Sequence, residues 1–309
     1  MRAAVLREDS FTIEDIPSPV CDGGATRLKV LGCGLNHRDL FIKMGQYAKI
    51  TYPAVLGSDV CGITDDGERV MVDPSLHWGP DPRAQGRDYQ ILGMPTQGGM
   101  AEEVCVPTEN LYPVPEHLSD EEASCYSISG VTAYRALFVR GDLQQGQTVL
   151  ITGIGGGVAT HALVFAAAAG ARILVSSRSE AKLKRAAEYG ADPVDLKRDK
   201  SSIDLIVDGI GGSTLNDYLD LVVPGGRIVV YGATVGAAPN INLHRIFWKQ
   251  INLLGTTMGT PRNFSSMVEF ITRHQIRPIV DSVYSLDNFA DAFTRMQNAD
   301  QFGKIVIRP

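Results

Sequence analysis

From Gln147 onward, continuous apolar runs alternate with segments of helical character, and this alternation constrains the fold more than any other feature. The apolar runs have the length of buried strands: Thr148–Thr152, Arg172–Ser176, Pro193–Leu196, Asp204–Asp208, Arg227–Tyr231 and Asn252–Gly255. The helical segments between them are Val158–Ala169, Glu180–Tyr189, Thr214–Val222 and Leu243–Trp248. Strands that are apolar throughout are covered on both faces, which is typical of parallel sheets flanked by helices. The pattern predicts an α/β fold with a doubly wound, six-stranded parallel sheet.

A glycine-rich turn follows the first of these strands. It reads TGIGGGVA over Thr152–Ala159 and precedes an Ala-rich helix. Glycines allow a tight turn and a close approach of the backbone to a pyrophosphate, whose charge is stabilised by N–H groups at the helix N-terminus. The alternative is a tight turn without a ligand, but the repeated strand–helix units favour a dinucleotide site. We predict cofactor contacts from Gly153, Gly155, Gly156, Gly157 and Val158.

The end of the second strand indicates which dinucleotide is bound. NAD sites usually place Asp or Glu there, to bind the ribose 2′-hydroxyl. This chain has Ser177 and Arg178 instead, with Lys182 in the following helix. Hydroxyl and cationic groups can bind a 2′-phosphate that a carboxylate would repel. The pattern favours NADPH, the alternative being an ordinary Ser-rich helix start with a solvated lysine.

The rest of the chain differs in character. The first 115 residues contain short apolar runs between Gly, Pro and Asp clusters, which predicts a β-rich domain. After about residue 262, helices over Ser265–Arg273 and Phe289–Met296 and a strand over Lys304–Ile307 form a tail too short for its own core. We therefore expect a discontinuous domain of residues 1–117 and 263–309, with a dinucleotide-binding domain of residues 118–262 between its parts.

Charge and cysteine content exclude several classes of function. The 29 Lys+Arg and 35 Asp+Glu residues give a net charge of −6, which argues against a nucleic-acid partner. The N-terminus lacks an apolar signal core, and the longest apolar stretch, Ala162–Ala171, is too short to span a membrane. Five widely spaced cysteines without a CxxC pair suggest neither a disulfide framework nor a zinc knuckle. The expectation is a cytoplasmic protein that binds a small-molecule substrate and contacts no membrane.

Seven segments spread over the chain resemble motifs of the medium-chain dehydrogenase/reductase superfamily. In the family's order they are CGLNHRDL (Cys33–Leu40), PAVLGSDVCG (Pro53–Gly62), GGMAEEVCVP (Gly98–Pro107), SGVTAYRAL (Ser129–Leu137), TGIGGGVA (Thr152–Ala159), VDGIGG (Val207–Gly212) and PGGRIVVYGAT (Pro224–Thr234). The resemblance implies a GroES-like catalytic domain joined to a Rossmann domain, an active site in the cleft between them, and a homodimer.

The zinc ligands of the superfamily's alcohol dehydrogenases are missing from this chain. Alignment of the motifs places Asn36, Ser58 and Ile128 at the positions of the catalytic ligands, and none supplies a thiolate, imidazole or carboxylate. The segment Pro74–Asp88, which corresponds to the structural zinc lobe, contains no cysteine. We expect no metal at either position. Asn36 in place of the first cysteine resembles the zinc-independent quinone oxidoreductase (zeta-crystallin-like) branch.

The resemblance implies four candidate catalytic residues in the first domain: Asn36, Asp39, Tyr47 and Tyr52. Asn36 could donate a hydrogen bond to the substrate oxygen, or form an Asx turn at a strand end. Asp39 could orient neighbouring polar groups or cap a helix, and the two phenols could donate to an enolate or pack. Further cofactor contacts are implied for Thr132, Gly232, Ala233, Thr234 and Met258.

We predict a zinc-independent, NADPH-dependent oxidoreductase that transfers hydride to a quinone or another acceptor conjugated with a carbonyl group. Without a Lewis-acid metal, such activated acceptors can still take hydride with hydrogen-bond assistance. One alternative is an enone or enoyl reductase, including one acting on a thioester. An alternative of another class is a non-catalytic NADPH-binding sensor or structural protein, because no residue is an unmistakable general acid.

Overall fold

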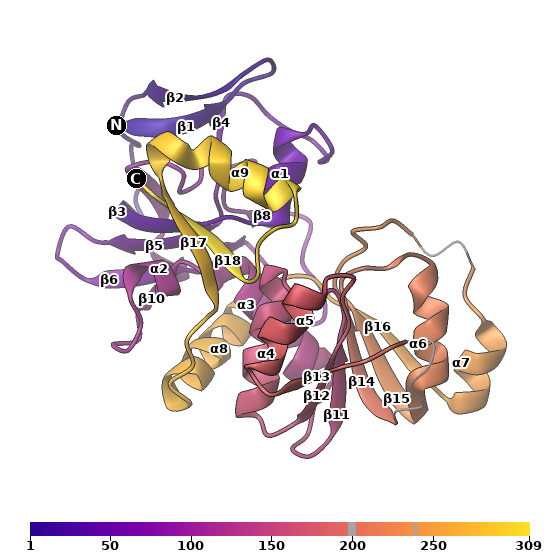
Figure 1. The fold of residues 1–309 in the computed structure, drawn as a ribbon. Coiled ribbons are helices and arrows are strands. Elements are labelled where there is room, and N and C mark those ends of the chain that lie inside the picture. The colour runs from indigo at the N-terminus through magenta and orange to yellow at the C-terminus, as the bar shows by residue number, and fades with distance from the viewer. Residues whose placement is uncertain (197–201, 238–239) are drawn as a thin grey trace. The chain divides into compact units, whose positions relative to one another are not determined.

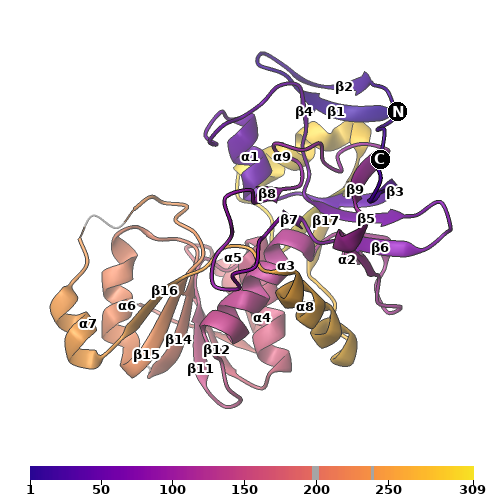
Figure 2. The same ribbon diagram turned by 180° about the vertical axis from the view of Figure 1, so that it is seen from behind.

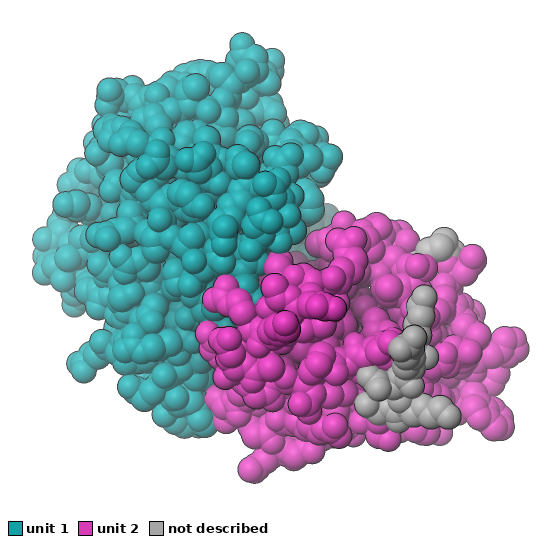
Figure 3. Space-filling view, in the orientation of Figure 1, with its two compact units in different colours: residues 1–131, 259–309 teal, residues 132–258 magenta. Residues whose placement is uncertain are grey.

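The computed structural model describes residues 1–196, 202–237 and 240–309. Contacts divide them into two compact units: Met1–Val131 with Gly259–Pro309, and Thr132–Met258 (Figure 3). The sequence analysis predicted the two domain boundaries after residues 117 and 262. In the structure, the backbone N–H of Ile128 donates to the carboxylate of Asp59 at 2.7 Å, which holds the stretch before Val131 in the first unit.

The second unit contains a six-stranded parallel sheet with the strand order β13-β12-β11-β14-β15-β16 (Figures 1 and 2). The chain starts at the centre and proceeds to one edge and then to the other, as in a doubly wound fold. The predicted parallel sheet is confirmed. Its strands are β11 (Thr148–Ile151), β12 (Arg172–Val175), β13 (Ala191–Pro193), β14 (Ile203–Asp208), β15 (Val222–Val230) and β16 (Asn252–Gly255). Its helical elements are η2 (Arg135–Arg140, π-helical), α4 (Gly157–Ala168), α5 (Glu180–Ala187), η3 (Gly212–Thr214), α6 (Leu215–Leu221) and α7 (Leu243–Lys249).

Two strands of this sheet begin two or more residues earlier than the apolar pattern indicated. β13 starts at Ala191 and ends at Pro193, where the pattern predicted a start. Proline has no N–H to donate, so it is tolerated at the end of an edge strand. β15 starts at Val222, and a register irregularity separates the pairs Ile203–Val222 and Leu205–Arg227. Pro224 and the two glycines before Arg227 therefore belong to the strand, although their residue types are unusual for one.

The first unit consists mainly of short strands. A seven-stranded sheet has the order β10-β6-β5-β3-β18-β17 with β9 also paired to β3, and smaller sheets have the orders β2-β1-β4 and β7-β8 (Figures 1 and 2). The strands are β1 (Arg2–Leu6), β2 (Phe11–Asp15), β3 (Ala25–Gly34), β4 (Ala54–Val55), β5 (Asp59–Ile63), β6 (Arg69–Val72), β7 (Ser75–Leu76), β8 (Gln90–Ile91), β9 (Glu103–Pro107), β10 (Leu111–Pro113), β17 (Val280–Ser285) and β18 (Lys304–Arg308). The helical elements are α1 (His37–Lys43), η1 (Thr108–Asn110), α2 (Asp120–Ala123), α3 (Ser127–Tyr134, ending in the second unit), α8 (Pro261–Arg273), η4 (Leu286–Asn288) and α9 (Phe289–Gln297).

The C-terminal segment completes the first unit by pairing with its longest strand. β18 lies antiparallel to the end of β3, with Val306 opposite Gly34 and Ile307 opposite Cys33. On the other side of β3, Gly34 is opposite Asp59 of β5. One hydrophobic core joins residues of β1 and α1 with Phe293 of α9 and with β18. The end of β3 is thus flanked by two strands that are distant in the sequence.

The structure contains a disulfide between Cys21 and Cys105, whose sequence separation is 84 residues. The expectation of no disulfide framework was wrong at this pair. β9 pairs with β3 so that Cys105 lies opposite Arg27, which brings it close to the segment preceding β3. Cysteine spacing carries no information about such a pairing between strands.

Within the described ranges, no helix is long and apolar enough to cross a lipid bilayer.

Candidate functional site

Asn36 lies in the turn between β3 and α1. β3 ends at Gly34 and α1 begins at His37, so the turn is only two residues long. The Asp39 carboxylate accepts hydrogen bonds from the backbone N–H groups of Asn36 at 2.8 Å and Gly57 at 3.2 Å. Asp39 is fully buried, so it holds the turn rather than facing solvent.

A buried ion pair lies directly against Asn36. Lys304, the first residue of β18, is 2% exposed, and Asp59, the first residue of β5, is completely buried. The Lys304 Nζ donates to Asp59 Oδ2 at 2.8 Å, to Asn36 Oδ1 at 2.9 Å and to the backbone oxygen of Leu35 at 2.8 Å. The other oxygen of Asp59 accepts from the backbone N–H of Ile128. These contacts fix the position and the rotation of the Asn36 carboxamide.

Burial dominates the electrostatics of these carboxyl groups. It raises the pKa of Asp39, an effect that the nearby Arg38 guanidinium opposes. Burial also raises the pKa of Asp59, and the Lys304 ammonium counteracts this shift. The burial cost of each carboxylate is thus offset in part by a cation and by backbone donors.

Arg38 connects the beginning of α1 to Tyr47. Its Nε donates to the Tyr47 hydroxyl at 3.2 Å, and its guanidinium carbon lies 5.1 Å from the ring centroid. Its Nη atoms donate to Ser58 Oγ at 3.1 Å and to the backbone oxygens of Leu92 and Met94 at 3.3 and 2.6 Å. The Tyr47 oxygen is an acceptor in this arrangement, so its hydrogen remains to be donated elsewhere.

The sequence-predicted residues of the first unit are brought together only in part. Asn36, Asp39 and Tyr47 are all tied to α1 or the turn before it. Tyr52 is 39% exposed and forms no hydrogen bond with another described residue. Sequence reasoning did not assign a role to Lys304, because a lysine at the start of a strand is ordinary and nothing local indicates its buried partner.

The donor atoms at Asn36, Ser58 and Ile128 do not fit a zinc ion. The oxygen of Asn36 accepts from the Lys304 ammonium, and a divalent cation at that oxygen would face a like charge. Ser58 Oγ donates to a backbone oxygen at 2.6 Å, and an isoleucine side chain has no lone pair. In the parts of the chain that the structure describes, no group of three or more His, Cys, Asp or Glu residues could hold a metal.

In the second unit, the glycine turn forms an open cradle in front of α4. Gly153 and Gly155 have φ angles of 63° and 121°, in the region that favours glycine. No atom lies within 4 Å of the place where a Cβ on Gly156 would be. The Nζ of Lys182 lies 3.0 Å from the Cβ position of Gly155, so its cation is beside this turn. An open glycine turn at a helix N-terminus beside a lysine fits a pyrophosphate.

The buried carboxylate of Asp208, at the end of β14, holds the neighbouring loops. Its oxygens accept from Thr152 Oγ1 at 2.6 Å, from Tyr218 Oη at 3.2 Å and from the backbone N–H groups of Ile210 and Gly211 at 3.2 and 3.0 Å. The contact to Thr152 ties the residue before the glycine turn to the next strand. The VDGIGG motif contained this residue, but its role was not predicted.

The loop after β12 carries the residues predicted to recognise the 2′-phosphate. Ser177 Oγ accepts from the backbone N–H of Ser179 at 3.1 Å, and Arg178 is exposed. The segment Ser176–Ser179 contains no Asp or Glu, and the nearest carboxylate in the sequence is that of Glu180, the first residue of α5. Lys182 lies beside the glycine turn, as described above, and Ser179 Oγ accepts its backbone N–H at 3.4 Å.

The remaining predicted cofactor residues lie at the ends of strands or of the unit. Thr234 donates from its side chain to the backbone oxygen of Gly209 at 3.3 Å, and Ala233 is exposed. A Cβ on Gly232 would lie 3.3 Å from that same oxygen. The buried residues Thr132 and Met258 are the first and last of the unit.

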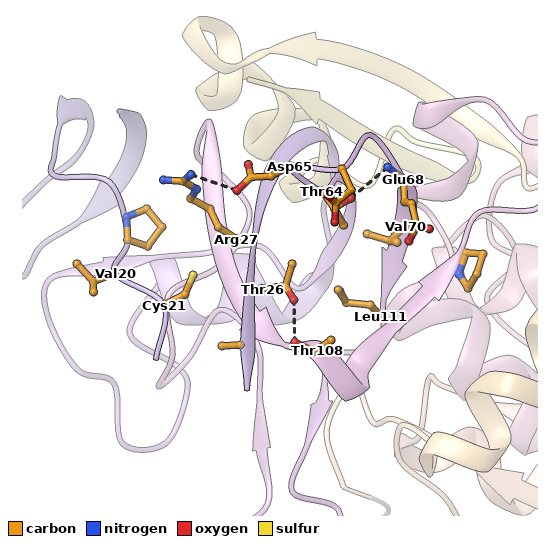
Figure 4. A pocket seen from close by; sticks show the side chains of 14 residues that line it. Val20, Cys21, Thr26, Arg27, Thr64, Asp65, Glu68, Val70, Thr108 and Leu111 are labelled. Atoms are coloured by element: carbon orange, nitrogen blue, oxygen red, sulfur yellow. Dashed lines mark hydrogen bonds and ion pairs between the residues drawn. The ribbon is translucent and has the colours of Figure 1, made fainter. Parts of the chain in front are cut away.

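A surface pocket of about 890 Å³ lies elsewhere on the first unit (Figure 4). It is lined by strand and loop residues that include Cys21 of the disulfide and the pair Arg27–Asp65, whose side chains approach within 3.3 Å. Thr26 and Thr108 share a hydrogen bond across its floor. None of the predicted catalytic or cofactor residues lines it.

Family models match most of both units. Residues 22–116 match the model described as alcohol dehydrogenase GroES-like domain, and residues 157–273 match the model described as zinc-binding dehydrogenase.

Individual proteins are similar over nine tenths or more of this chain. The zinc-type alcohol dehydrogenase-like protein YogA of Leptosphaeria maculans is 32% identical, over 91% of this chain and 89% of its own. The acryloyl-coenzyme A reductase of Sulfurisphaera tokodaii is 26% identical over 100% of both chains. A crystal structure of an NAD-dependent alcohol dehydrogenase, 28% identical over 100% of both chains, superposes with a TM-score of 0.93.

Proposed function

Because the chain belongs to the medium-chain dehydrogenase/reductase superfamily, we propose that it is an NADPH-dependent reductase whose acceptor is conjugated with a carbonyl group and whose reaction needs no metal ion. The observation that carries this proposal is the Lys304 ammonium hydrogen-bonded to the oxygen of Asn36, where a zinc-dependent enzyme would need a ligand. An acceptor that can delocalise charge is less dependent on a Lewis acid than a simple ketone.

The cofactor half of the proposal is supported by the second unit. The fold is that of an NAD(P)-binding dehydrogenase, and the glycine turn with Lys182 supplies backbone N–H groups and a cation for the pyrophosphate. Ser177 and Arg178 would hold the 2′-phosphate of NADPH. Bound there, the nicotinamide supplies a hydride.

The first unit would stabilise the charge that the hydride creates. When the β-carbon of a conjugated carbonyl compound gains hydride, the electron pair of the C=C bond moves toward the carbonyl oxygen. The Asn36 amide can donate a hydrogen bond to that oxygen. The Tyr47 hydroxyl, whose oxygen already accepts from Arg38, can supply the proton that completes the reduction at the α-carbon.

Among activated acceptors, an α,β-unsaturated carbonyl compound is favoured over a quinone. One relative that is similar over 100% of both chains bears the name acryloyl-coenzyme A reductase, and an acryloyl thioester has a C=C bond conjugated with its carbonyl. Quinones share the conjugated carbonyl and remain the second class of acceptor.

An activity screen tests the proposal. Purified protein is incubated with NADPH and an enoyl thioester, a simple enone, a small quinone or a ketone, each with and without a chelator. We expect oxidation of NADPH with the conjugated acceptors, unaffected by the chelator, and little with the ketone. A chelator-sensitive ketone reduction would contradict it. NADPH binding without reduction of any acceptor would instead favour the non-catalytic sensor.

We also propose a homodimer formed through the β16 edge of the second unit's sheet. β16 is an edge strand whose residue Leu253 is 39% exposed, and the adjacent helix α7 exposes Leu243, Phe247 and Trp248, the last by 82%. A second copy that continued the sheet would satisfy the free strand edge and cover these apolar side chains.

A further inference from the structure

Lys304 cannot touch a substrate, because its donors are already used. An ammonium group has three N–H donors and no acceptor. In this structure the three acceptors are Asp59 Oδ2, Asn36 Oδ1 and the backbone oxygen of Leu35, all within 2.9 Å. The side chain is 2% exposed. Any role of Lys304 in the reaction must therefore be exerted through one of these partners.

The ammonium determines which end of the Asn36 carboxamide faces inward. The oxygen and nitrogen of an asparagine side chain are similar in shape, and their assignment follows from their hydrogen-bond partners. An ammonium has nothing to accept from the amide NH₂, so only the oxygen of Asn36 can face Lys304. The NH₂ group then points away from the ammonium. Its nitrogen lies 3.3 Å from the backbone oxygen of Gly34, and the amide also interacts with the Asp59 carboxyl, whose pKa it lowers. A bound acceptor oxygen would compete with these contacts for the NH₂ group.

The surrounding residues are shaped for this contact. A Cβ on Gly34 would lie 3.2 Å from Cε of Lys304 and would meet the backbone oxygen of Ser124. Glycine at this position therefore leaves room for the lysine stem beside the strand end. Asp59 keeps the ammonium in place, and its second oxygen is itself held by the backbone N–H of Ile128.

Stability alone is a poor explanation for this arrangement. A fully buried ion pair loses so much hydration that well-packed apolar residues are frequently no less stable. A fixed orientation of Asn36 gives the pair a specific use. Polarisation by the ammonium also strengthens the amide as a donor, since hydrogen bonds in a chain reinforce one another.

We infer that Lys304, held by Asp59, is a positioning residue that locks Asn36 as a hydrogen-bond donor toward the carbonyl oxygen of the acceptor. This inference rests on the proposed function and adds the group that selects the reactive face of Asn36. The chain thus carries an internal, covalently attached cation one hydrogen bond away from the candidate oxygen-binding group. The cation acts through the amide and makes no contact with the substrate.

The test replaces the ion pair in two ways. Lys304→Met with Asp59→Leu removes both charges and every donor to the Asn36 oxygen. Lys304→Met with Asp59→Asn also removes both charges, but its new amide NH₂ can donate to Asn36 and its oxygen can still accept from Ile128. We expect the first pair to lower kcat by between about 10- and 100-fold with a smaller change in KM, because the donor matters most as charge develops. The second pair should recover much of this loss.

Coupling to Asn36 separates positioning from a general structural effect. Asn36→Ala should by itself lower kcat by about 100-fold. In that background, either double replacement of the ion pair should change kcat less than twofold, since the group it positions is gone. If the Leu-containing replacement lowers kcat as much in the Asn36→Ala background as in the parent, or if it has no effect in folded protein that retains Asn36, the inference is wrong. Should the Leu-containing variant not fold, the Asn36 carboxamide signals of the Asn-containing variant, described below, decide the question instead.

A matched control removes a different ion pair from the C-terminal segment. Arg295 contacts the buried carboxylate of Asp281 at 2.6 Å, and neither residue contacts Asn36. Arg295→Met with Asp281→Asn is expected to lower stability and leave kcat unchanged. If this control lowered kcat as much as replacement of the Lys304–Asp59 pair, the loss of kcat would be attributed to lower stability.

A measurement without turnover keeps this inference distinct from the proposed function. In protein labelled with ¹³C,¹⁵N-asparagine, the Asn36 carboxamide signals are identified by their loss in Asn36→Ala. Loss of the ammonium in the Leu-containing variant, or its replacement by a neutral donor in the Asn-containing variant, should shift the ¹³Cγ signal and speed the exchange of the NH₂ hydrogens. Unchanged signals in a folded variant would overturn the inference even if acceptors are reduced. Shifted signals with no acceptor reduced by the parent protein would retain the positioning of Asn36 and reject the proposed reaction.

Discussion

The burial of Asp73 predicts that the free energy of unfolding depends strongly on pH. It follows β6 and is fully buried. One carboxyl oxygen accepts from the backbone N–H of Ser75 at 3.0 Å, and the other has no hydrogen-bond partner among the described residues. Burial without a compensating cation raises the pKa of Asp73 to about 7.

The sign and size of the effect follow from this shift. The group is protonated in the folded protein at pH values where it is ionised in the unfolded chain, whose pKa is near 3.8. The folded state therefore binds more protons, and its stability falls as pH rises through this window. The difference amounts to about 4 kcal/mol in full, of which about 2 kcal/mol is lost between pH 5 and pH 7.

Asp73→Asn removes this titration while keeping an acceptor for Ser75. We expect the free energy of unfolding of the variant to lack the decline of about 2 kcal/mol between pH 5 and pH 7. The amide NH₂ needs a new partner and lowers stability by about 1–3 kcal/mol, but this cost does not depend on pH. The slope, rather than the absolute stability, is therefore the quantity to compare.

Tryptophan fluorescence can follow the relevant unit. The chain has two tryptophans: Trp78, which is buried a few residues after Asp73, and Trp248, which is exposed on the second unit. In a Trp248→Phe background, denaturant unfolding monitored by Trp78 at pH 5, 6, 7 and 8 reports on the first unit. Asp81→Asn is the control, because the Arg83 guanidinium lowers the pKa of the half-buried Asp81, which therefore does not titrate between pH 5 and pH 8. Equal slopes for the parent and Asp73→Asn would refute the reasoning.

Three further predictions concern the second unit. Arg178→Ala should raise the Kd for NADPH about tenfold and leave that for NADH unchanged, as measured by fluorescence titration at low salt; equal losses for both would remove the 2′-phosphate argument. Gly155→Val should lower the affinity for both NADPH and NADH at least about tenfold in the same titration, because the φ of 121° disfavours a side chain and a Cβ would press on Lys182. Unchanged binding would show that the turn does not hold the pyrophosphate. Phe247→Asp with Trp248→Asp should convert a dimer into a monomer in light scattering coupled to gel filtration, because charge on both sides of the symmetric contact is repelled; a persistent dimer would place the interface elsewhere.

Motif and pattern reasoning reached the superfamily, the parallel sheet and the glycine turn because these features are local. A buried parallel strand must be apolar along its whole length, and the tight turn after β11 needs glycine at Gly153 and Gly155. Both requirements appear in consecutive residues. The start of β15 was missed since Pro224 and Gly225 lie within the strand, where pairing with β14 outweighs local preference.

The candidate site depends on contacts between distant segments. Lys304 and Asn36 are 268 residues apart, and the contact exists because β18 pairs with the end of β3. Cys21 and Cys105 are likewise joined through β9 and β3. A single sequence does not indicate which residues of distant strands become neighbours when the strands pair.

By itself, the sequence determined the fold class, the position of the glycine turn and the lack of zinc-binding side chains at Asn36, Ser58 and Ile128, because each is a property of residue type at a known place in the chain. Only the tertiary structure decided that the oxygen of Asn36 faces an ammonium and that the carboxylate of Asp39 accepts hydrogen bonds from backbone N–H groups. The physical reason is that burial and hydrogen-bond partners arise when strands pair. Those partners in turn determine which atom of a polar side chain remains available to bind a ligand.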